Sequence, residues 1–220
     1  MALRVHKFTF NPFSENTYLL ISENNKAAVF DPGMYDTNER EIFLNFLVER
    51  EIELVQLFNT HCHLDHVFGN AFVADEFGLP LQMHKDDLVT LDQGAKAASM
   101  YGLNLDPSPA PEVFLEHGEF VELDGNRLEI RLCPGHCPGH IVFINHEQHF
   151  VIGGDVLFEG SVGRVDLPGG NASDLDRSIR TQLYTLSDDY TVHPGHGNAT
   201  TIGEEKKSNH FVYEGGSRLL

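Results

Sequence analysis

Alternating and continuous runs of hydrophobic residues divide the chain into short predicted strands and a few helices. Residues 7–10 (KFTF) and 16–22 (NTYLLIS) alternate or run apolar as strands do, and residues 27–33 (AAVFDPG) predict a buried strand that ends in a turn. Residues 37–51 place hydrophobic side chains at helical spacing. The first part of the chain is therefore predicted to form sheet and then a helix.

The middle of the chain continues the alternation of strand and helix. Residues 53–60 (ELVQLFNT) predict a buried strand, and residues 65–78 predict one helix that Gly78 closes. Residues 83–102 also have helical spacing. Residues 103–114 contain three prolines and are predicted to form an irregular surface connection.

The last third of the chain is predicted to return to strands around one further helix. Strand patterns and one helical pattern follow one another here, the strands at residues 127–136, 140–145, 149–158 and 190–197 and the helix at residues 172–187. We find no internal repeat, low-complexity segment or linker. The whole chain, 1–220, is therefore expected to be a single domain.

The composition of the chain indicates a sizeable hydrophobic core and argues against nucleic acid and membranes as partners. With 220 residues, of which 41% are hydrophobic, the chain can bury a sizeable core without disulfides. Its net charge is −18, from 33 acidic against 15 basic residues. Binding of nucleic acid or of an anionic membrane surface needs a dense basic patch, so neither is an expected partner.

The start of the chain and its cysteines predict a cytoplasmic protein. MALRVHKFTF has no apolar signal-peptide core, and no apolar run approaches the roughly 20 residues that cross a bilayer. Three cysteines, Cys62, Cys133 and Cys137, are an odd number for a disulfide framework. A reducing compartment fits this composition.

Histidine and aspartate are concentrated directly after the strand predicted at residues 53–60. The segment THCHLDHVFG places His61, His63, Asp65 and His66 within six positions. Alternation on an extended segment points His61 and His63 to the same side. Such a pair of imidazoles suits a metal ion.

Other strand ends carry the same types of residue beside glycine or proline. His136 and His140 lie in CPGHCPGH, Asp155 in GGDVLF, and His193 and His196 in HPGHG. A site assembled from loops at one edge of a sheet requires such residues at the ends of several strands. Imidazole and carboxylate ligands suit Zn, Fe or Mn, and an open coordination position is typical of a catalytic site.

Taken in order, THCHLDH, CPGHCPGH, GGDVLF and HPGHG resemble the motifs of the metallo-β-lactamase superfamily. The resemblance is strongest to short glyoxalase II-like hydrolases and extends through GSVGRVDLPGG and GHGNATTIGEEKKSNHF. It implies an α+β fold, a four-layer αββα sandwich with two metal ions at one edge.

The resemblance also implies a ligand set and an activity. It places His61, His63 and His136 on the first metal, Asp65, His66 and His196 on the second, and Asp155 between the two. The metals are expected to be divalent, with Zn first and Fe or Mn as alternatives. A hydroxide bridging them would attack the carbonyl of a small-molecule thioester, as in hydroxyacylglutathione hydrolases. Asp65 would in addition orient that hydroxide or accept its proton.

Several neighbouring residues are expected to act outside the ligand set. His140 and His193 are interpreted as supporting donors, and Cys62 as a buried group beneath its loop. Asp31 either accepts a hydrogen bond from a ligand histidine or shapes the turn before Gly33.

Arg164, Lys206 and Lys207 are candidate anchors for substrate carboxylates. Full-length glyoxalase II enzymes carry a C-terminal helical domain that contacts glutathione, whereas this sequence stops soon after HFVYEGGSRLL. We therefore expect a glutathione thioester to bind weakly.

Alternative functions remain. A persulfide dioxygenase with a single iron is one, since GRVD is weakly similar to that branch, and a lactonase is another. A metal-binding module without catalysis and an RNA-processing nuclease are both disfavoured, the first by Asp65 and the second by the net charge.

Overall fold

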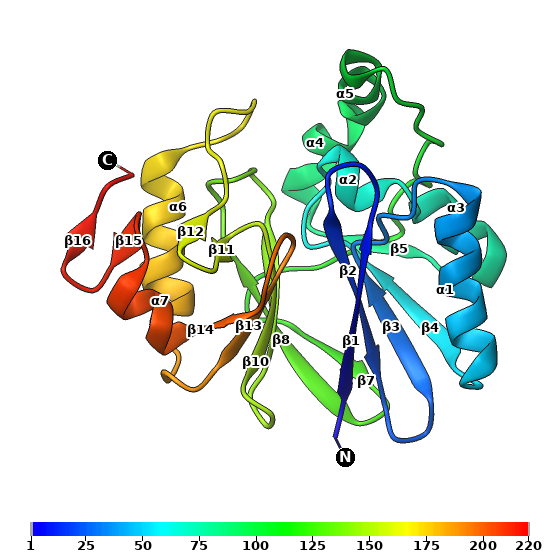
Figure 1. Cartoon of the computed structure of the whole chain (residues 1–220), viewed down its shortest axis with the longest axis horizontal. Coiled ribbons are helices and arrows are strands. Elements are labelled where there is room, and N and C mark those ends of the chain that lie inside the picture. Colours follow the sequence, from blue (N-terminus) through cyan, green and yellow to red (C-terminus); the bar gives the residue numbers. More distant parts are fainter. Residues whose placement is uncertain (1, 220) are drawn as a thin grey trace.

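Two six-stranded sheets lie face to face, and helices cover their outer faces. The computed structural model describes residues 2–219. The first sheet has the order β1-β2-β3-β4-β5-β6, with strands Arg4–Phe10, Glu15–Ile21, Lys26–Phe30, Glu53–Phe58, Leu81–Met83 and Val113–Phe114. Figure 1 shows this sheet beside α1 (Thr37–Glu49) and α3 (Asn70–Phe77).

The second sheet follows in the chain and has its own helical layer. Its order is β14-β13-β10-β9-β8-β7, with strands Thr200–Thr201, Thr191–Pro194, Phe150–Gly154, Ile141–Asn145, Asn126–Leu132 and Phe120–Leu123. Its outer face carries α6 (Ala172–Ser178), the π-helical turn η2 (Ile179–Leu183) and α7 (Ile202–Ser208). The molecule is therefore the expected α+β sandwich with four αββα layers.

The remaining elements are short. They are α2 (Leu64–Val67), the 3₁₀ turn η1 (Lys85–Asp87), α4 (Leu88–Asp92), α5 (Gly94–Tyr101) and the two hairpins β11 (Leu157–Phe158) with β12 (Ser161–Val162) and β15 (Val212–Tyr213) with β16 (Gly216–Ser217). In residues 2–219, no helix has both the length and the hydropathy to cross a bilayer.

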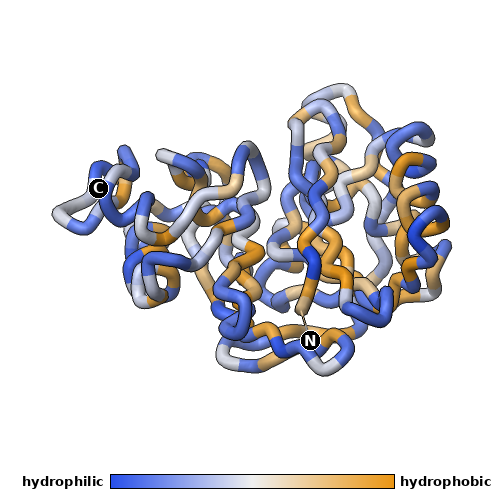
Figure 2. The backbone as a smooth tube through the Cα atoms, turned by 60° about the horizontal axis from the view of Figure 1, so that its bottom comes forward, coloured by the Kyte–Doolittle hydropathy of each residue, from blue (hydrophilic) through white to orange (hydrophobic). Residues whose placement is uncertain are grey.

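Strand β2 shows how the alternating pattern builds the layers. All seven of its residues are buried. Leu19 and Ile21 pack towards the helices, whereas Tyr18 and Leu20 pack towards the second sheet. Successive side chains of a strand point to opposite faces, so one strand contributes to two cores. Figure 2 shows hydrophobic segments running through the interior of the molecule and hydrophilic segments at many of its outer turns.

Two predicted helices are divided in the structure. The prediction of one helix over 65–78 is wrong, because the chain forms α2 and α3 with a break at Gly69. The Gly69 N–H donates to the Pro32 carbonyl at 2.7 Å, and a Cβ at this position would lie 2.7 Å from the same oxygen. Residues 83–102 likewise form η1, α4 and α5 instead of one helix.

The carboxyl ends of parallel strands place the polar loops at one edge of the sandwich. Pairs β3–β4 and β10–β13 are parallel, so the segments after these strands emerge on the same side. The two sheets are joined there by an isolated bridge between Glu15 and His196 and by the N–H of Ile141, which donates to the Thr60 carbonyl at 2.9 Å. The loops are therefore held against one another.

Removing the aromatic centre of the inter-sheet core should destabilise the whole fold. The Phe143 side chain is fully buried, and its ring centroid lies 4.9 Å from that of Phe30 and 5.3 Å from that of Phe58. Phe143→Ala should lower the free energy of unfolding by about 3–5 kcal/mol, measured by denaturant titration. The control Phe120→Ala removes a ring that is 47% exposed, and a comparable loss there would contradict the assignment of the core.

Candidate metal centre

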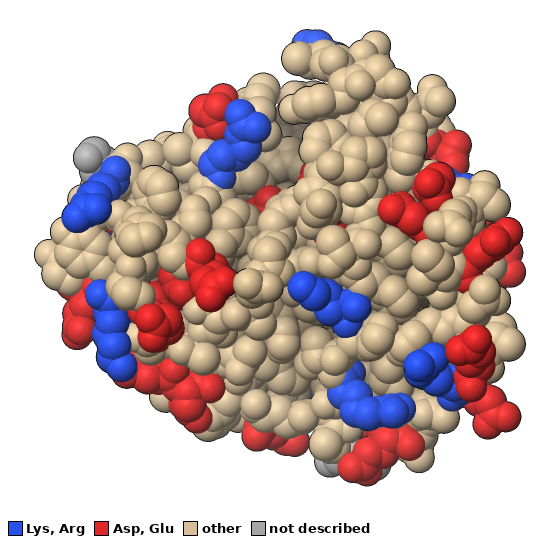
Figure 3. Space-filling model, viewed as in Figure 1, with Lys and Arg blue, Asp and Glu red and all other residues tan. Residues whose placement is uncertain are grey.

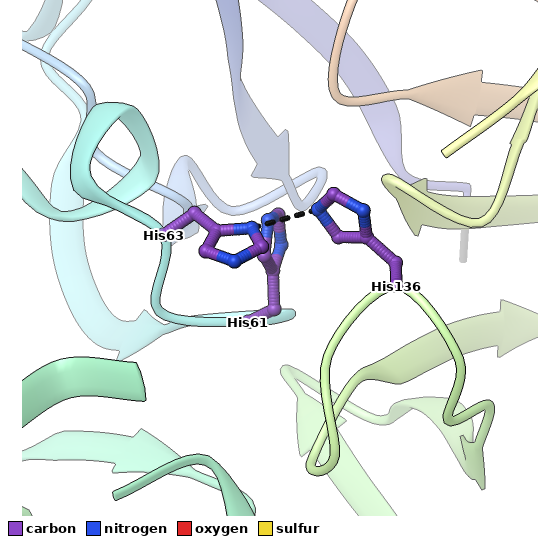
Figure 4. Close-up of side chains that lie close together, drawn as sticks. All are labelled: His61, His63 and His136. Carbon is purple, nitrogen blue, oxygen red and sulfur yellow. Dashed lines mark hydrogen bonds between the residues drawn. The ribbon is translucent and has the colours of Figure 1, made fainter. Parts of the chain in front are cut away.

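One group of three imidazoles comes from two loops at the edge of the sandwich. His61 and His63 follow β4, and His136 follows β8. Each offers a ligand nitrogen, and these nitrogens lie within 4.8 Å of one another. Figure 4 shows the rings of His63 and His136 facing each other, with His63 Nδ1 and His136 Nε2 2.7 Å apart. The alternation of His61 and His63 therefore brings both to one side, as predicted.

A second group lies beside the first. Asp65, His66 and His196 also offer ligand atoms within 4.8 Å of one another. Asp65 Oδ2 lies 3.0 Å from His196 Nε2 and 3.6 Å from His66 Nε2. His196 reaches this position because β2 and the HPGHG loop are hydrogen-bonded, with the Asn16 N–H donating to the Gly195 carbonyl at 2.7 Å.

The Asp155 carboxylate faces both groups. Its Oδ2 lies 3.5 Å from His136 Nε2 and 4.0 Å from His61 Nε2 in the first group, and 3.6 Å from His196 Nε2 in the second. Its Oδ1 lies 3.6 Å from His66 Nε2. The structure therefore brings together all seven residues proposed as ligands.

The donor atoms fit two metal ions. Among the described residues, His61 Nε2, His66 Nε2 and Asp155 Oδ1 are buried and have no hydrogen-bond partner. A buried polar group without a partner costs about 1–3 kcal/mol. A cation at each group would satisfy these atoms, and nitrogen and carboxylate donors suit Zn, Fe or Mn.

The neutral state of the imidazoles in the first group favours metal binding. Burial, reinforced by neighbouring imidazoles, holds the pKa of His61 well below its usual value. Burial and then the charge of His136 lower the pKa of His63 to about 3. Both rings are therefore neutral near pH 7 and present lone pairs.

The carboxylates around the second group remain ionised. Burial alone would raise the pKa of Asp155, but the positive charge of His66 lowers it well below the usual range. The pKa of His66 is in turn raised, because Asp65 and Asp155 outweigh the effect of burial. Positive charge is thus required at this position, and a divalent cation would supply it in place of the proton on His66.

Asp31 fulfils both roles considered for it. Its Oδ2 lies 3.2 Å from His66 Nδ1, on the side of the ring opposite the metal group. Its backbone is left-handed, with φ of 51°, and its Oδ1 accepts the Thr60 N–H at 2.7 Å. One aspartate therefore orients a ligand histidine and shapes the turn.

The supporting histidines lie outside the two groups. His140 Nε2 accepts the Asp155 N–H at 2.9 Å, and its ring stacks on that of His61. The ring of His193 instead lies 5.5 Å from that of Tyr18, and burial lowers its pKa to about 4. Cys62, Cys133 and Cys137 are buried free thiols.

Two buried carboxyl groups near the site have no sequence motif that identifies them. Glu15 begins β2 and lies 3.8 Å from His66 Nδ1, measured to its Oε1. Burial, reinforced by the charge of Asp31, raises its pKa well above the usual value, although the charge of His66 opposes this. Asp87 lies in the turn before α4 and is also fully buried. The local signal for Glu15 is an acidic residue directly before the strand predicted at residues 16–22.

A cavity of about 520 Å³ opens above the two groups. Apolar side chains form much of its wall, among them Phe13, Met100, Tyr101 and Phe158. Two cations, Lys96 on α5 and Arg164, also line it. Figure 3 shows the hollow between the parts labelled α5 and α6 in Figure 1.

The three predicted substrate anchors lie in different places. Arg164 lines the cavity, where its guanidinium pairs with Asp166 at 2.7 Å through both Nε and Nη2. Lys206 and Lys207 do not reach it. They line a separate cavity beside Arg180 and Glu214, because α7 packs against β15 on the outer layer. The structure therefore does not bring these two lysines to the cavity above the metal groups.

Comparisons with known proteins agree with this geometry. Residues 10–196 match the family described as the metallo-beta-lactamase superfamily. Hydroxyacylglutathione hydrolase GloC from Haemophilus influenzae is 39% identical over 202 residues, which cover 91% of this chain and 93% of that protein.

Solved structures share the fold over nearly the whole chain. TTHA1623 in a di-iron-bound form has a TM-score of 0.83 and 35% identity, and the match covers 93% of this chain and 98% of that one. BLEG-1 B3 metallo-beta-lactamase has a TM-score of 0.87 and 27% identity, over 94% and 98% of the two chains. The chain therefore belongs to the metallo-beta-lactamase superfamily and is a metallo-hydrolase of that fold.

Proposed function

We propose that the protein is a dinuclear metal-dependent thioester hydrolase of the hydroxyacylglutathione hydrolase type. The observation that carries the proposal is the position of Asp155 between two groups of three donors, at the base of a largely apolar cavity. The 39% identity to a hydroxyacylglutathione hydrolase supports the thioester substrate. We further propose a cytoplasmic location, a small-molecule substrate, and no nucleic acid or membrane partner.

The proposed ligands would hold two metal ions. His61, His63 and His136 would hold one metal, Asp65, His66 and His196 the other, and Asp155 both. When bound, the metals would supply Lewis acidity for a carbonyl oxygen and for the attacking water. Zn is our first choice, and the di-iron-bound form of TTHA1623 makes iron a direct alternative.

The protein's own groups would orient the reaction and exclude water. Asp65 is buried to most of its extent, and its Oδ2 faces His196, so its carboxylate is placed to orient the attacking water or to accept a proton from it. Phe158 and Met100 line the cavity and would reduce access of bulk solvent to the carbonyl. A thiolate leaving group requires little help from a general acid.

The dinuclear assignment predicts two metal equivalents per chain that depend on Asp155. Asp155→Ala should lower the metal content below two equivalents and reduce kcat/KM on the order of 100-fold or more, measured by elemental analysis and thioester turnover. His193→Ala is the matched control, because His193 lies in β13, the strand that pairs with β10 just before Asp155, but outside both groups. Full metal content and turnover in the Asp155 variant would remove this carboxylate from the site.

The substrate assignment predicts hydrolysis of S-lactoylglutathione by the metal-loaded protein. Release of free thiol should be detectable, with a high KM, because Arg164 is already paired with Asp166 and offers a weakened anchor. The same preparation is assayed with a lactone and, through oxygen uptake, with a persulfide. Activity on either of these without any thioester hydrolysis would overturn the proposal.

The cavity lining predicts which cations contact an anionic thioester. Arg164→Ala and Lys96→Ala should each raise KM about 2- to 5-fold and leave metal content unchanged. The Arg164 variant retains its backbone carbonyl, which accepts from His136 Nδ1 at 2.7 Å, so the ligand keeps its support. Lys206→Ala and Lys207→Ala serve as controls in the separate cavity. An equal rise in KM for these controls would show a nonspecific effect of charge.

A further inference from the structure

Asp87 is a fully buried carboxylate that belongs to neither donor group. Its side chain is 0% exposed, at the end of η1. Its Oδ2 accepts the Cys62 N–H at 2.5 Å. Its Oδ1 accepts the Thr90 hydroxyl at 2.8 Å and the Gly139 N–H at 3.3 Å. Charge-assisted hydrogen bonds of this kind are about twice as strong as neutral ones.

The two N–H groups come from the two loops that carry the first donor group. Cys62 stands between His61 and His63 in the chain, and Gly139 follows His136 by three residues. Each oxygen of one carboxylate therefore holds one of the loops. The relative position of the three imidazoles depends on both bonds, because the loops come from different sheets.

The packing around Asp87 leaves no room for a side chain at position 139. A Cβ at Gly139 would lie 2.3 Å from Asp87 N and 2.6 Å from Asp87 Cβ. The thiols of Cys62 and Cys137 are buried beside the same carboxylate. The glycine before His140 thus allows the loop to approach the turn that carries Asp87.

The second donor group has a different support. The Asp31 carboxylate contacts His66, and the Asn59 amide donates to the His66 carbonyl at 3.1 Å. His196 is held by β2 through Asn16. The hydrogen bonds of Asp87 involve none of these residues, so its replacement should act mainly on the group of His61, His63 and His136.

We infer that Asp87 is a positioning residue that sets the spacing of His61, His63 and His136 by binding the backbone of both loops. The inference rests on the metal-binding part of the proposed function and is independent of the substrate. An asparagine here would retain one acceptor oxygen and turn an NH₂ donor towards one of the two N–H groups, so it can hold only one loop.

The first experiment measures the affinity of each metal equivalent in the full-length protein by chelator competition with Zn²⁺. Asp87→Asn should weaken one equivalent about 10- to 100-fold and leave the other within about 2-fold. Equal weakening of both equivalents, or none, would contradict the inference.

Background variants identify which equivalent is affected. In His196→Ala, which disables the second group, Asp87→Asn should weaken the remaining equivalent by the same 10- to 100-fold. In His63→Ala, which disables the first group, it should leave the remaining equivalent unchanged. If Asp87→Asn instead weakened the equivalent that remains in His63→Ala and spared the one that remains in His196→Ala, Asp87 would support the second group. That result would overturn the inference.

Controls separate positioning from general stability. Asp86→Asn alters the neighbouring exposed carboxylate, and Thr90→Val removes the Asp87 bond to α4 without touching either loop. Both should retain two tight equivalents. A fall in the unfolding temperature of metal-free Asp87→Asn with both affinities unchanged would show a purely structural role.

Gly139→Ala tests the same contact from the opposite loop and remains available if Asp87→Asn does not fold. Its added Cβ should displace the loop of His136 and weaken the same equivalent. Unchanged affinities in Gly139→Ala would contradict the inference. Failure of the wild-type protein to bind two equivalents would instead refute the dinuclear proposal, so the two failures are distinguishable.

Discussion

The burial of several ionised carboxylates at one edge of the sandwich is the constraint on which the site depends. Asp65 and Asp155 lie within 4 Å of His66 Nε2, largely removed from water. Negative charges in such a position are costly unless positive charge compensates them. The raised pKa of His66 and the lowered pKa of Asp155 reflect this electrostatic requirement. A bound divalent cation would meet the same requirement and would thereby link metal occupancy to the stability of the loops.

Much of the architecture and of the donor set could be predicted from the sequence. The second half of β2, from Tyr18 to Ile21, is apolar on both faces because the strand lies between helices and a second sheet, and this produces a continuous apolar run. His61, His63 and Asp155 are recognisable because each stands directly after such a run, where strand ends meet. Each of these signals lies within a short segment of the chain, so a single sequence is enough to reveal it.

Other features depend on contacts between distant segments and could not be read locally. Gly69 divides a helical pattern because Pro32, more than thirty positions earlier, supplies a carbonyl at the same point. Lys206 and Lys207 follow a motif that carries a ligand, yet α7 directs them to the outer layer. Asp87 stands in a charged segment, KDD, that resembles a solvated turn. Its burial arises only when the loops of Cys62 and Gly139 close over it.

The distribution of charge is compatible with the anionic thioester that we propose as the substrate of this acidic protein. A net charge of −18 opposes the approach of anions over the whole surface, but this repulsion falls off over about 8–10 Å in physiological salt. Inside the cavity the nearest cations are Lys96 and Arg164, on opposite segments of the wall. Both side chains are solvent-exposed, and Arg164 is paired with Asp166, so their attraction for an anion acts only over the short distances within the cavity. In the proposed function, the charged part of the substrate would therefore be recognised at the cavity, while the acidic surface opposes the association of other polyanions.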